Sequence, residues 1–271
     1  MADQPRIYPE GVPCWVDIEV ADREAAERFY SAVFGWEFLP AMPPEAPGFY
    51  DIAALKEQDA AAIGGGTGEP VWNTYIACDD VDSTAAAVTE AGGTVLSPPA
   101  DAGPGGRLAV CADPQGAVFR LWQARRRLGA QIVNEPGAWN FSYLRTPEPD
   151  AALAFYGAVF GWRVDPDLGA GMIRLPGYGE HLASTVDPGI HERQAFAPPG
   201  FADVVAGIAP TDGPACWEVR FTSADRDESV EAVRRAGGQV LSSAETDWTR
   251  EAVVADPPGA TFVVSQLAPR E

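Results

Sequence analysis

The stretch FYSAVFGW at residues 29–36 recurs, with one substitution, as FYGAVFGW at residues 155–162. A longer match follows each copy. Residues 71–124 and residues 216–268 share, in the same order, an AGG tripeptide, a short apolar run and a DPxGAxF segment. Because self-similarity in a fixed order is the signature of an internal repeat, the sequence predicts two tandem copies of one domain.

The predicted domain boundaries follow from the two copies. We place the N-terminal domain at residues 1–126 and the C-terminal domain at residues 137–271, joined by the linker RRRLGAQIVNEP at residues 125–136. The second copy is longer than the first, and we place its insertion at about residues 187–214, which are rich in Pro and Gly. Long structureless segments are uncommon in compact domains. A lid, a partner contact and a tolerated surface insertion all remain open for this segment.

Each copy divides again into two units with the order strand, helix, then strands. In the first unit, PCWVDIEV at residues 13–20 alternates as a strand does, and ADREAAERFYSAVFG at residues 21–35 has the spacing of a helix. Asp22 is the expected N-cap of this helix, and Gly35 ends it. The same order recurs three more times. The sequence therefore predicts an α+β fold of four tandem βαβββ units.

Bulk charge and hydropathy limit the partners. The formal net charge is −20 and the pI is about 4.3, which disfavours binding to nucleic acid or to anionic membranes. No apolar run approaches the length of a membrane span, and the N-terminal residues lack a signal-peptide core, so we expect a cytoplasmic protein. Cys14, Cys78, Cys111 and Cys216 form no CxxC pair, and we expect them to be reduced and buried rather than zinc ligands.

The four βαβββ units, the FYxxVFGW segments and the DPxGAxF segments together resemble the vicinal oxygen chelate superfamily, in particular its two-domain actinobacterial members. This group includes glyoxalase I, the bleomycin resistance proteins and the extradiol dioxygenases. The resemblance implies open, cupped mixed sheets with helices outside and a ligand inside. It is also compatible with a homodimer. Because the superfamily includes enzymes and drug binders that catalyse nothing, function has to be inferred from the site itself.

Strand alternation predicts which side chains face each cup, because the apolar face of each strand should meet the helices. The predicted first cup contains Trp15, Asp17, Glu19, Asn73, Tyr75, Arg120 and Trp122. The predicted second cup contains Phe141, Tyr143, Arg145, Glu218, Arg220, Thr222, Thr261, Val263 and Ser265. The glycine-rich GGGTG at residues 64–68 precedes no helix and is not followed by the Lys of a phosphate-binding loop.

Metal-dependent members of the superfamily hold a divalent ion with His, Gln or Glu side chains. Three of their four ligand positions transfer to this chain, as Trp15, Asn73 and Arg120 in the first half and as Phe141, Glu218 and Val263 in the second. An indole cannot ligate a metal, and a guanidinium repels one. His181 lies near the expected fourth position of the second half, although the alignment there is loose. The residues therefore predict no metal, and we expect no other cofactor.

Two hypotheses remain for the function. The first is a binding protein of the resistance or sequestration type, which holds an aromatic or cationic natural product by stacking and cation–π contact. Its predicted ligand-binding residues are Trp15, Asn73, Trp122, Tyr143, Arg145, Glu218 and Arg220. Core packing of the aromatic rings is the structural alternative, and a salt bridge is the alternative role for Glu218.

The second hypothesis is a metal-free tailoring enzyme, such as an isomerase, cyclase or lyase. Asp17 or Glu19 would act as general base, and Arg120 or Tyr75 would stabilise an oxyanion. Pairing of Arg120 with one of the carboxylates is the structural alternative here. A metal-dependent glyoxalase or dioxygenase, which the resemblance alone would suggest, is disfavoured by the residues at the ligand positions.

Overall fold

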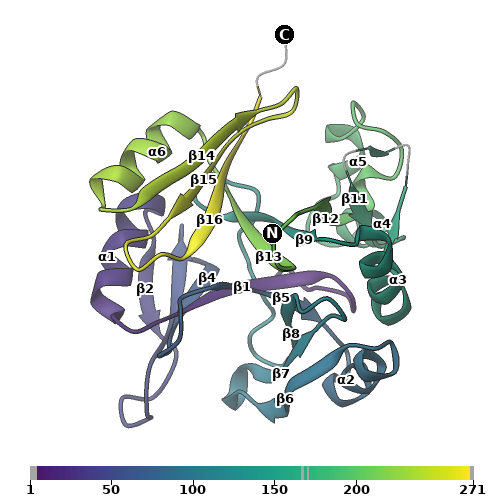
Figure 1. Cartoon of the computed structure of the whole chain (residues 1–271), viewed down its shortest axis with the longest axis horizontal. Coiled ribbons are helices and arrows are strands. Elements are labelled where there is room, and N and C mark those ends of the chain that lie inside the picture. The colour runs from purple at the N-terminus through teal and green to yellow at the C-terminus, as the bar shows by residue number, and fades with distance from the viewer. Residues whose placement is uncertain (1–4, 166–167, 170, 269–271) are drawn as a thin grey trace. The chain divides into compact units, whose positions relative to one another are not determined.

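The computed structural model describes residues 5–165, 168–169 and 171–268 (Figure 1). Each half of the sequence forms one eight-stranded mixed sheet. The strand orders are β2-β3-β4-β1-β5-β8-β7-β6 and β10-β11-β12-β9-β13-β16-β15-β14, which match position by position. In the first sheet, β1 pairs in parallel with β4, and β5 with β8. In the second sheet, β9 pairs in parallel with β12, and β13 with β16. The outer strand pairs are antiparallel. The predicted α+β class and the fourfold βαβββ repeat are confirmed.

The strands of the two halves correspond one to one, although β10 and β11 are shorter than β2 and β3. The first half contains β1 (Pro13–Val20), β2 (Glu37–Pro40), β3 (Tyr50–Leu55), β4 (Gln58–Gly65), β5 (Trp72–Ala77), β6 (Thr94–Asp101), β7 (Gly106–Ala112) and β8 (Val118–Ala124). The second half contains β9 (Trp139–Thr146), β10 (Arg163–Val164), β11 (Met172–Arg174), β12 (Val204–Pro210), β13 (Cys216–Thr222), β14 (Gln239–Glu245), β15 (Thr249–Ala255) and β16 (Thr261–Leu267).

The four helices of the βαβββ units lie where the sequence indicates, while two further helices, at residues 178–184 and 190–193, were not predicted. They are α1 (Arg23–Phe34), α2 (Val81–Glu90), α3 (Pro149–Phe160), α4 (Tyr178–Ser184), α5 (Ile190–Arg193) and α6 (Arg226–Arg235), with 3-10 turns η1 (Gly103–Gly105) and η3 (Phe201–Asp203). The Asp22 side chain accepts from the Ala25 N–H, and Gly35 follows α1 with a φ of 73°. This left-handed conformation suits glycine. None of the helices within the described ranges is both long and apolar enough to span a membrane.

The chain forms two compact units, and each unit takes segments from both halves of the sequence. Unit 1 contains the N-terminal residues up to Cys14 together with Thr74–Gly129 and Ser142–Trp217. Unit 2 contains Trp15–Asn73 and Ala130–Phe141 together with the residues from Glu218 onward. Helices α1 and α6, from the first and last βαβββ units, accordingly lie side by side in unit 2 (Figure 1).

The duplicated FYxxVFGW phrase forms the aromatic core of each unit. In unit 2, Tyr30 is fully buried, and its hydroxyl donates to Asp256 Oδ2 at 2.9 Å. Asp256 begins the DPPG turn, and its Oδ1 accepts from the Gly259 and Ala260 N–H groups at 2.9 and 2.6 Å. Rings from both halves surround Tyr30: Phe29, Phe34, Trp36, Trp72 and Phe262. The repeated FYxxVFGW segment and the repeated DPxG turn therefore contact each other in the core.

Unit 1 repeats this contact with the other copies of the phrase and the turn. The Tyr156 hydroxyl donates to Asp113 Oδ2 at 3.3 Å. Asp113 Oδ1 accepts from the Gln115 and Ala117 N–H groups at 2.9 Å each. The last Trp of each phrase is also anchored within its own unit. Trp36 Nε1 donates to Gly137 O in unit 2, and Trp162 Nε1 donates to Gly11 O in unit 1.

The second glycine of each AGG tripeptide makes room for the Phe of the phrase. A Cβ on Gly238 would lie 2.6 Å from Ala255 O and 2.9 Å from Phe29 Cε2. We expect Gly238→Ala to lower the free energy of unfolding by about 2 kcal/mol, because backbone and ring must both move. Denaturant titration measures this loss. A Cβ on Gly68, also in unit 2, meets no atom within 4 Å, so Gly68→Ala is the matched control. Equal losses in the two variants would contradict this account of the AGG repeat.

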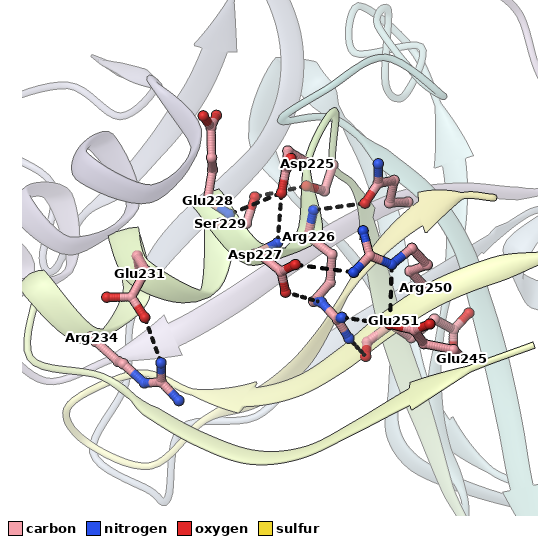
Figure 2. Close-up of polar contacts among 12 residues, drawn as sticks. Asp225, Arg226, Asp227, Glu228, Ser229, Glu231, Arg234, Glu245, Arg250 and Glu251 are labelled. Carbon is pink, nitrogen blue, oxygen red and sulfur yellow. Dashed lines mark hydrogen bonds and ion pairs between the residues drawn. The ribbon is translucent and has the colours of Figure 1, made fainter. Parts of the chain in front are cut away.

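A network of ion pairs attaches the start of α6 to the β14–β15 hairpin in unit 2 (Figure 2). Arg226 is 6% exposed, and its Nη2 lies 2.9 Å from Glu245 Oε1. Asp227 bridges Arg226 at 2.7 Å and Arg250 at 3.0 Å. Guanidinium groups suit such shared pairs, because each presents several donors in one plane. The network therefore positions a helix on a sheet, and we assign it a structural role.

The extra length of the second half lies at residues 175–203, between β11 and β12. In the first half, β3 and β4 are joined by Lys56 and Glu57 alone. The predicted insertion at 187–214 is therefore displaced, and it is not structureless, because it contains α5, η3 and β12. The prediction failed because β12 (VVAGIAP) is short and apolar and follows a Pro-rich loop, so its pattern is weak.

Three of the four cysteines are buried as predicted, namely Cys14, Cys78 and Cys111. Burial raises the pKa of the Cys111 thiol to about 11, so this group stays protonated at neutral pH. The prediction was wrong for Cys216, which is exposed at the first residue of β13. Side chains alternate between the two faces of β13, and it is the next residue, Trp217, that is buried.

Candidate functional site

Four side chains on β1, β3 and β5 form a hydrogen-bonded group in unit 2, which we call the Asp17 cluster. Trp15 Nε1 donates to the Tyr50 hydroxyl at 2.9 Å, and this hydroxyl donates to Asp17 Oδ2 at 3.0 Å. Asn73 Nδ2 donates to Asp17 Oδ1 at 2.9 Å. Asp17 is 0% exposed, while Tyr50 and Asn73 are half-buried. Three of the predicted site residues thus lie together, around one buried carboxyl group.

Tyr50 is the member that sequence reasoning missed, and the glycines at residues 64–66 lie beside it and beside Glu19. A Cβ on Gly64 would lie 3.1 Å from the Tyr50 ring. A Cβ on Gly66 would lie 2.7 Å from Glu19 Cβ. The glycines therefore leave space for two larger side chains on neighbouring strands, which gives this glycine-rich stretch a packing role.

Glu19 extends the acidic character of β1. It is two residues beyond Asp17 on the same strand, so alternation places both carboxyl groups on one face. Unlike Asp17, Glu19 is exposed. This face of unit 2 therefore combines two carboxyl groups with the indole of Trp15 and the phenol of Tyr50. Such a combination suits a ligand that has both an aromatic ring and a positive charge.

Tyr75, Arg120 and Trp122 form a second group, in unit 1. Arg120 Nη1 donates to the Tyr75 hydroxyl at 2.7 Å, and the guanidinium carbon lies 5.3 Å from the Tyr75 ring centroid. Tyr75 and Trp122 meet edge to face at 6.2 Å. Trp122 also lines a pocket of about 180 Å³ with Tyr8 and Cys78. The structure brings these three side chains together, and their roles in binding or catalysis remain predictions.

The second-half candidates are also divided between the units. In unit 1, Arg145 lies over the Tyr143 ring at 6.0 Å, and the absence of a side chain at Gly207 makes room for that ring. In unit 2, Arg220 binds Glu218 at 2.7 Å and Glu251 at 2.6 Å. Glu218 is therefore a salt-bridge partner, which is the alternative role considered for it, while its predicted role in ligand binding stays a prediction. Sequence reasoning missed Glu251, because its strand β15 shows no clear alternation next to the bulged edge strand β14.

The residues at the superfamily's ligand positions do not fit a divalent metal. Trp15 and Asn73 direct N–H donors at Tyr50 and Asp17, and donors do not ligate cations. The second half presents Phe141 and Val263, with Glu218 already bound to Arg220. Among the residues that the structure describes, no three His, Cys, Asp or Glu side chains are grouped so as to hold a metal ion.

The notional fourth ligand position near residues 60–64 falls on β4, and its counterpart in the second sheet is β12. These strands pair in parallel with β1 and β9. His181 lies on helix α4, with its Nε2 3.2 Å from Ile7 O, so the suggestion that it stands near the fourth position was wrong.

Comparison with known proteins agrees with this architecture. A family model described as a glyoxalase-like domain matches residues 15–122 and residues 142–265. The chain is 37% identical over 274 residues to "Putative glyoxylase CFP32" of Mycobacterium tuberculosis, covering 97% of this chain and 98% of that protein. It is 31% identical over 277 residues to "Anthracycline biosynthesis protein DnrV" of Streptomyces peucetius, covering 96% and 94%.

Solved structures show the same fold at low identity. The Mn(II)-bound glyoxalase from Novosphingobium aromaticivorans aligns with a TM-score of 0.62 at 18% identity, covering 95% of this chain and 83% of that chain. The 2,3-dioxygenase LapB from Pseudomonas sp. KL28 aligns with a TM-score of 0.59 at 14% identity, covering 95% and 93%. The repeated βαβββ architecture, the matched family model and the full-length relatives together place the chain in the glyoxalase-like domain family of the vicinal oxygen chelate superfamily.

Proposed function

We propose that this chain is a small-molecule-binding protein that holds an aromatic, cationic ligand without a metal ion. The Asp17 cluster carries this proposal. At positions where metal-dependent members of the superfamily have ligands, this chain has an amide that donates to the buried Asp17 carboxyl group and an indole that donates to Tyr50, the other partner of that group. The cluster thus offers an organic ligand a fixed carboxyl group behind the half-buried Tyr50 and Asn73.

The physical basis is a fixed charge beside aromatic surface. Asp17 is already removed from water, and Tyr50 and Asn73 hold its two oxygens, so little ordering is required when a ligand binds. A ligand cation would gain from this carboxylate and from Glu19, while a flat ring would gain from contact with Trp15 and Tyr50. The net charge of −20 further favours the approach of a cation.

The relatives support the natural-product part of the proposal. Two Streptomyces proteins of matching length are named for anthracycline biosynthesis. Anthracyclines combine a flat ring system with an amino sugar, which is the ligand chemistry that the Asp17 cluster suits. We therefore choose doxorubicin, a fluorescent anthracycline, as the test ligand.

Doxorubicin is expected to bind the chelator-treated protein, with the same affinity after Mn²⁺ is added back. Trp15→Leu should weaken binding about tenfold, the scale of one lost ring contact with a cationic ligand. Fluorescence titration measures both. Phe141→Leu is the matched control, because Phe141 is the counterpart of Trp15 in the second copy and should leave the affinity unchanged. Binding that requires the metal, or an affinity that is unchanged in Trp15→Leu, would overturn the proposal.

Acid–base catalysis is the second candidate, because the Tyr50 hydroxyl and the Asp17 carboxyl group share a hydrogen bond at 3.0 Å through which a proton can move. Asp17→Asn separates the two functions. A binding protein should lose affinity for the cationic drug but keep its affinity for the neutral aglycone, doxorubicinone. An enzyme should lose turnover of any substrate, with its binding affinity largely retained.

A further inference from the structure

The extra segment of the second half forms an open pocket of its own. The pocket has a volume of about 430 Å³ and lies wholly within unit 1, lined only by residues between Gly177 and Asp203. This volume is within the range of sites for small organic ligands. The first half has no counterpart, because Lys56 and Glu57 alone connect the equivalent strands. The pocket is thus separate from the Asp17 cluster in unit 2.

Backbone and side-chain contacts hold the pocket walls in place. Asp203 Oδ1 accepts from the Gly179 N–H at 2.8 Å, and Asp203 O accepts from the Leu175 N–H at 2.9 Å. A Cβ on Gly179 would lie 2.7 Å from Ala202 Cβ, so α4 packs directly on η3. An ion pair between Arg193 and Asp187 closes the turn that leads into α5. A pocket with such fixed walls loses little entropy on binding.

The lining is rich in hydrogen-bond acceptors and has an aromatic wall. Glu180 and Asp203 contribute carboxyl groups, and Phe201 contributes a ring. Gln194 Oε1 is buried without a hydrogen-bond partner among the described residues, which is costly unless a ligand or solvent donor supplies one. His191 Nε2 lies 3.1 Å from Glu180 Oε1 at the same site. The lining residues include neither Lys nor Arg.

We propose that this pocket binds a small polar amine through its ammonium group. An ammonium ion presents three donors and a positive charge, which match the Gln194 carbonyl, the Glu180 carboxylate and the face of Phe201. A carboxylate or phosphate ligand would meet the negative charge of the Glu180 and Asp203 carboxyl groups. The inference does not depend on the proposed function of the Asp17 cluster, because the two sites share no residue.

The test uses two ring compounds that differ in one group. Isotope-labelled full-length protein is titrated with trans-4-aminocyclohexanol, which is protonated at neutral pH, and with the neutral trans-1,4-cyclohexanediol. We expect the amine to shift backbone amide signals within residues 177–203, and the diol to bind at least about threefold more weakly. No shift with the amine, shifts elsewhere in the chain, or equal affinity for the diol would each overturn the proposal.

Two variants test the acceptors. Glu180→Gln and Gln194→Leu should each weaken amine binding about threefold to tenfold, the scale of one charge-assisted hydrogen bond. Glu192→Gln is the matched control, because Glu192 is exposed on α5 and does not line the pocket. An equal effect of Glu192→Gln would show a general charge effect and overturn the assignment. Doxorubicin titration of the same variants is expected to be unchanged, so failure of one proposal can be told from failure of the other.

Discussion

Residues 1–129 expressed without the rest of the chain are expected not to fold. Each compact unit needs partners from both halves, and the fragment lacks the Phe221 and Phe262 rings that pack on Phe34 in unit 2. It also lacks Asp256, which binds the Tyr30 hydroxyl. Removing one large buried ring costs about 3–5 kcal/mol, and a whole domain is stabilised by only about 5–15 kcal/mol.

Near-ultraviolet circular dichroism and urea titration of the fragment check this expectation. The fragment should show weak aromatic signals and no cooperative transition, and co-expression with residues 130–271 should restore both. The uncut chain is the control. A fragment 1–129 that unfolds cooperatively by itself would contradict the joint construction of the units from both halves.

Asp256→Ala is expected to lower the free energy of unfolding by about 3 kcal/mol, whereas Asp256→Asn should cost little at neutral pH. Alanine leaves the Tyr30 hydroxyl and the N–H groups of Gly259 and Ala260 without their buried acceptor. An asparagine carbonyl can still accept from both N–H groups, and its amide can donate to the Tyr30 oxygen. Urea unfolding at pH 7 distinguishes the two variants, and equal losses would contradict the assigned contacts.

The free energy of unfolding of the wild type relative to Asp256→Asn is also expected to depend on pH. Burial raises the pKa of Asp256 above its ordinary value of 3.8 and outweighs the hydrogen bonds that lower it. The folded state therefore holds this proton more tightly than the unfolded state, so the contribution of Asp256 to stability falls as pH rises from about 4 through the raised pKa. The wild-type stability minus that of Asp256→Asn should fall over this window. A difference that is constant or rises with pH would contradict the buried position of the carboxyl group.

Local pattern was sufficient to predict the elements and several of their contacts. The spacing of apolar residues at 21–35 indicated a helix, and Asp22 and Gly35 marked its two ends, whereas Trp36, expected on the same helix face, lies beyond the end of α1. Alternation along β1 placed Trp15 and Asp17 on one face, and both side chains contact Tyr50. These features depend on neighbours within one strand or one helical turn, so the sequence displays them directly.

Long-range pairing could not be predicted in the same way. Tyr50 joins the Asp17 cluster only because β3 pairs with β4 and β4 pairs with β1, and a register between strands has no local signal. The sequence also did not indicate that each compact unit combines segments from both halves. The two copies of the phrase and of the turn are nearly identical, so each Tyr could have met either Asp from its sequence alone.

Native mass spectrometry of the full chain with doxorubicin tests the central claim most directly, because it weighs the protein, an organic ligand and any metal together. The protein is purified without added metal and incubated with the drug and Mn²⁺. The account predicts a species carrying the drug and no divalent ion, and loss of this species in Trp15→Leu but not in Phe141→Leu. A species that carries the drug only when it also carries a divalent ion would contradict it.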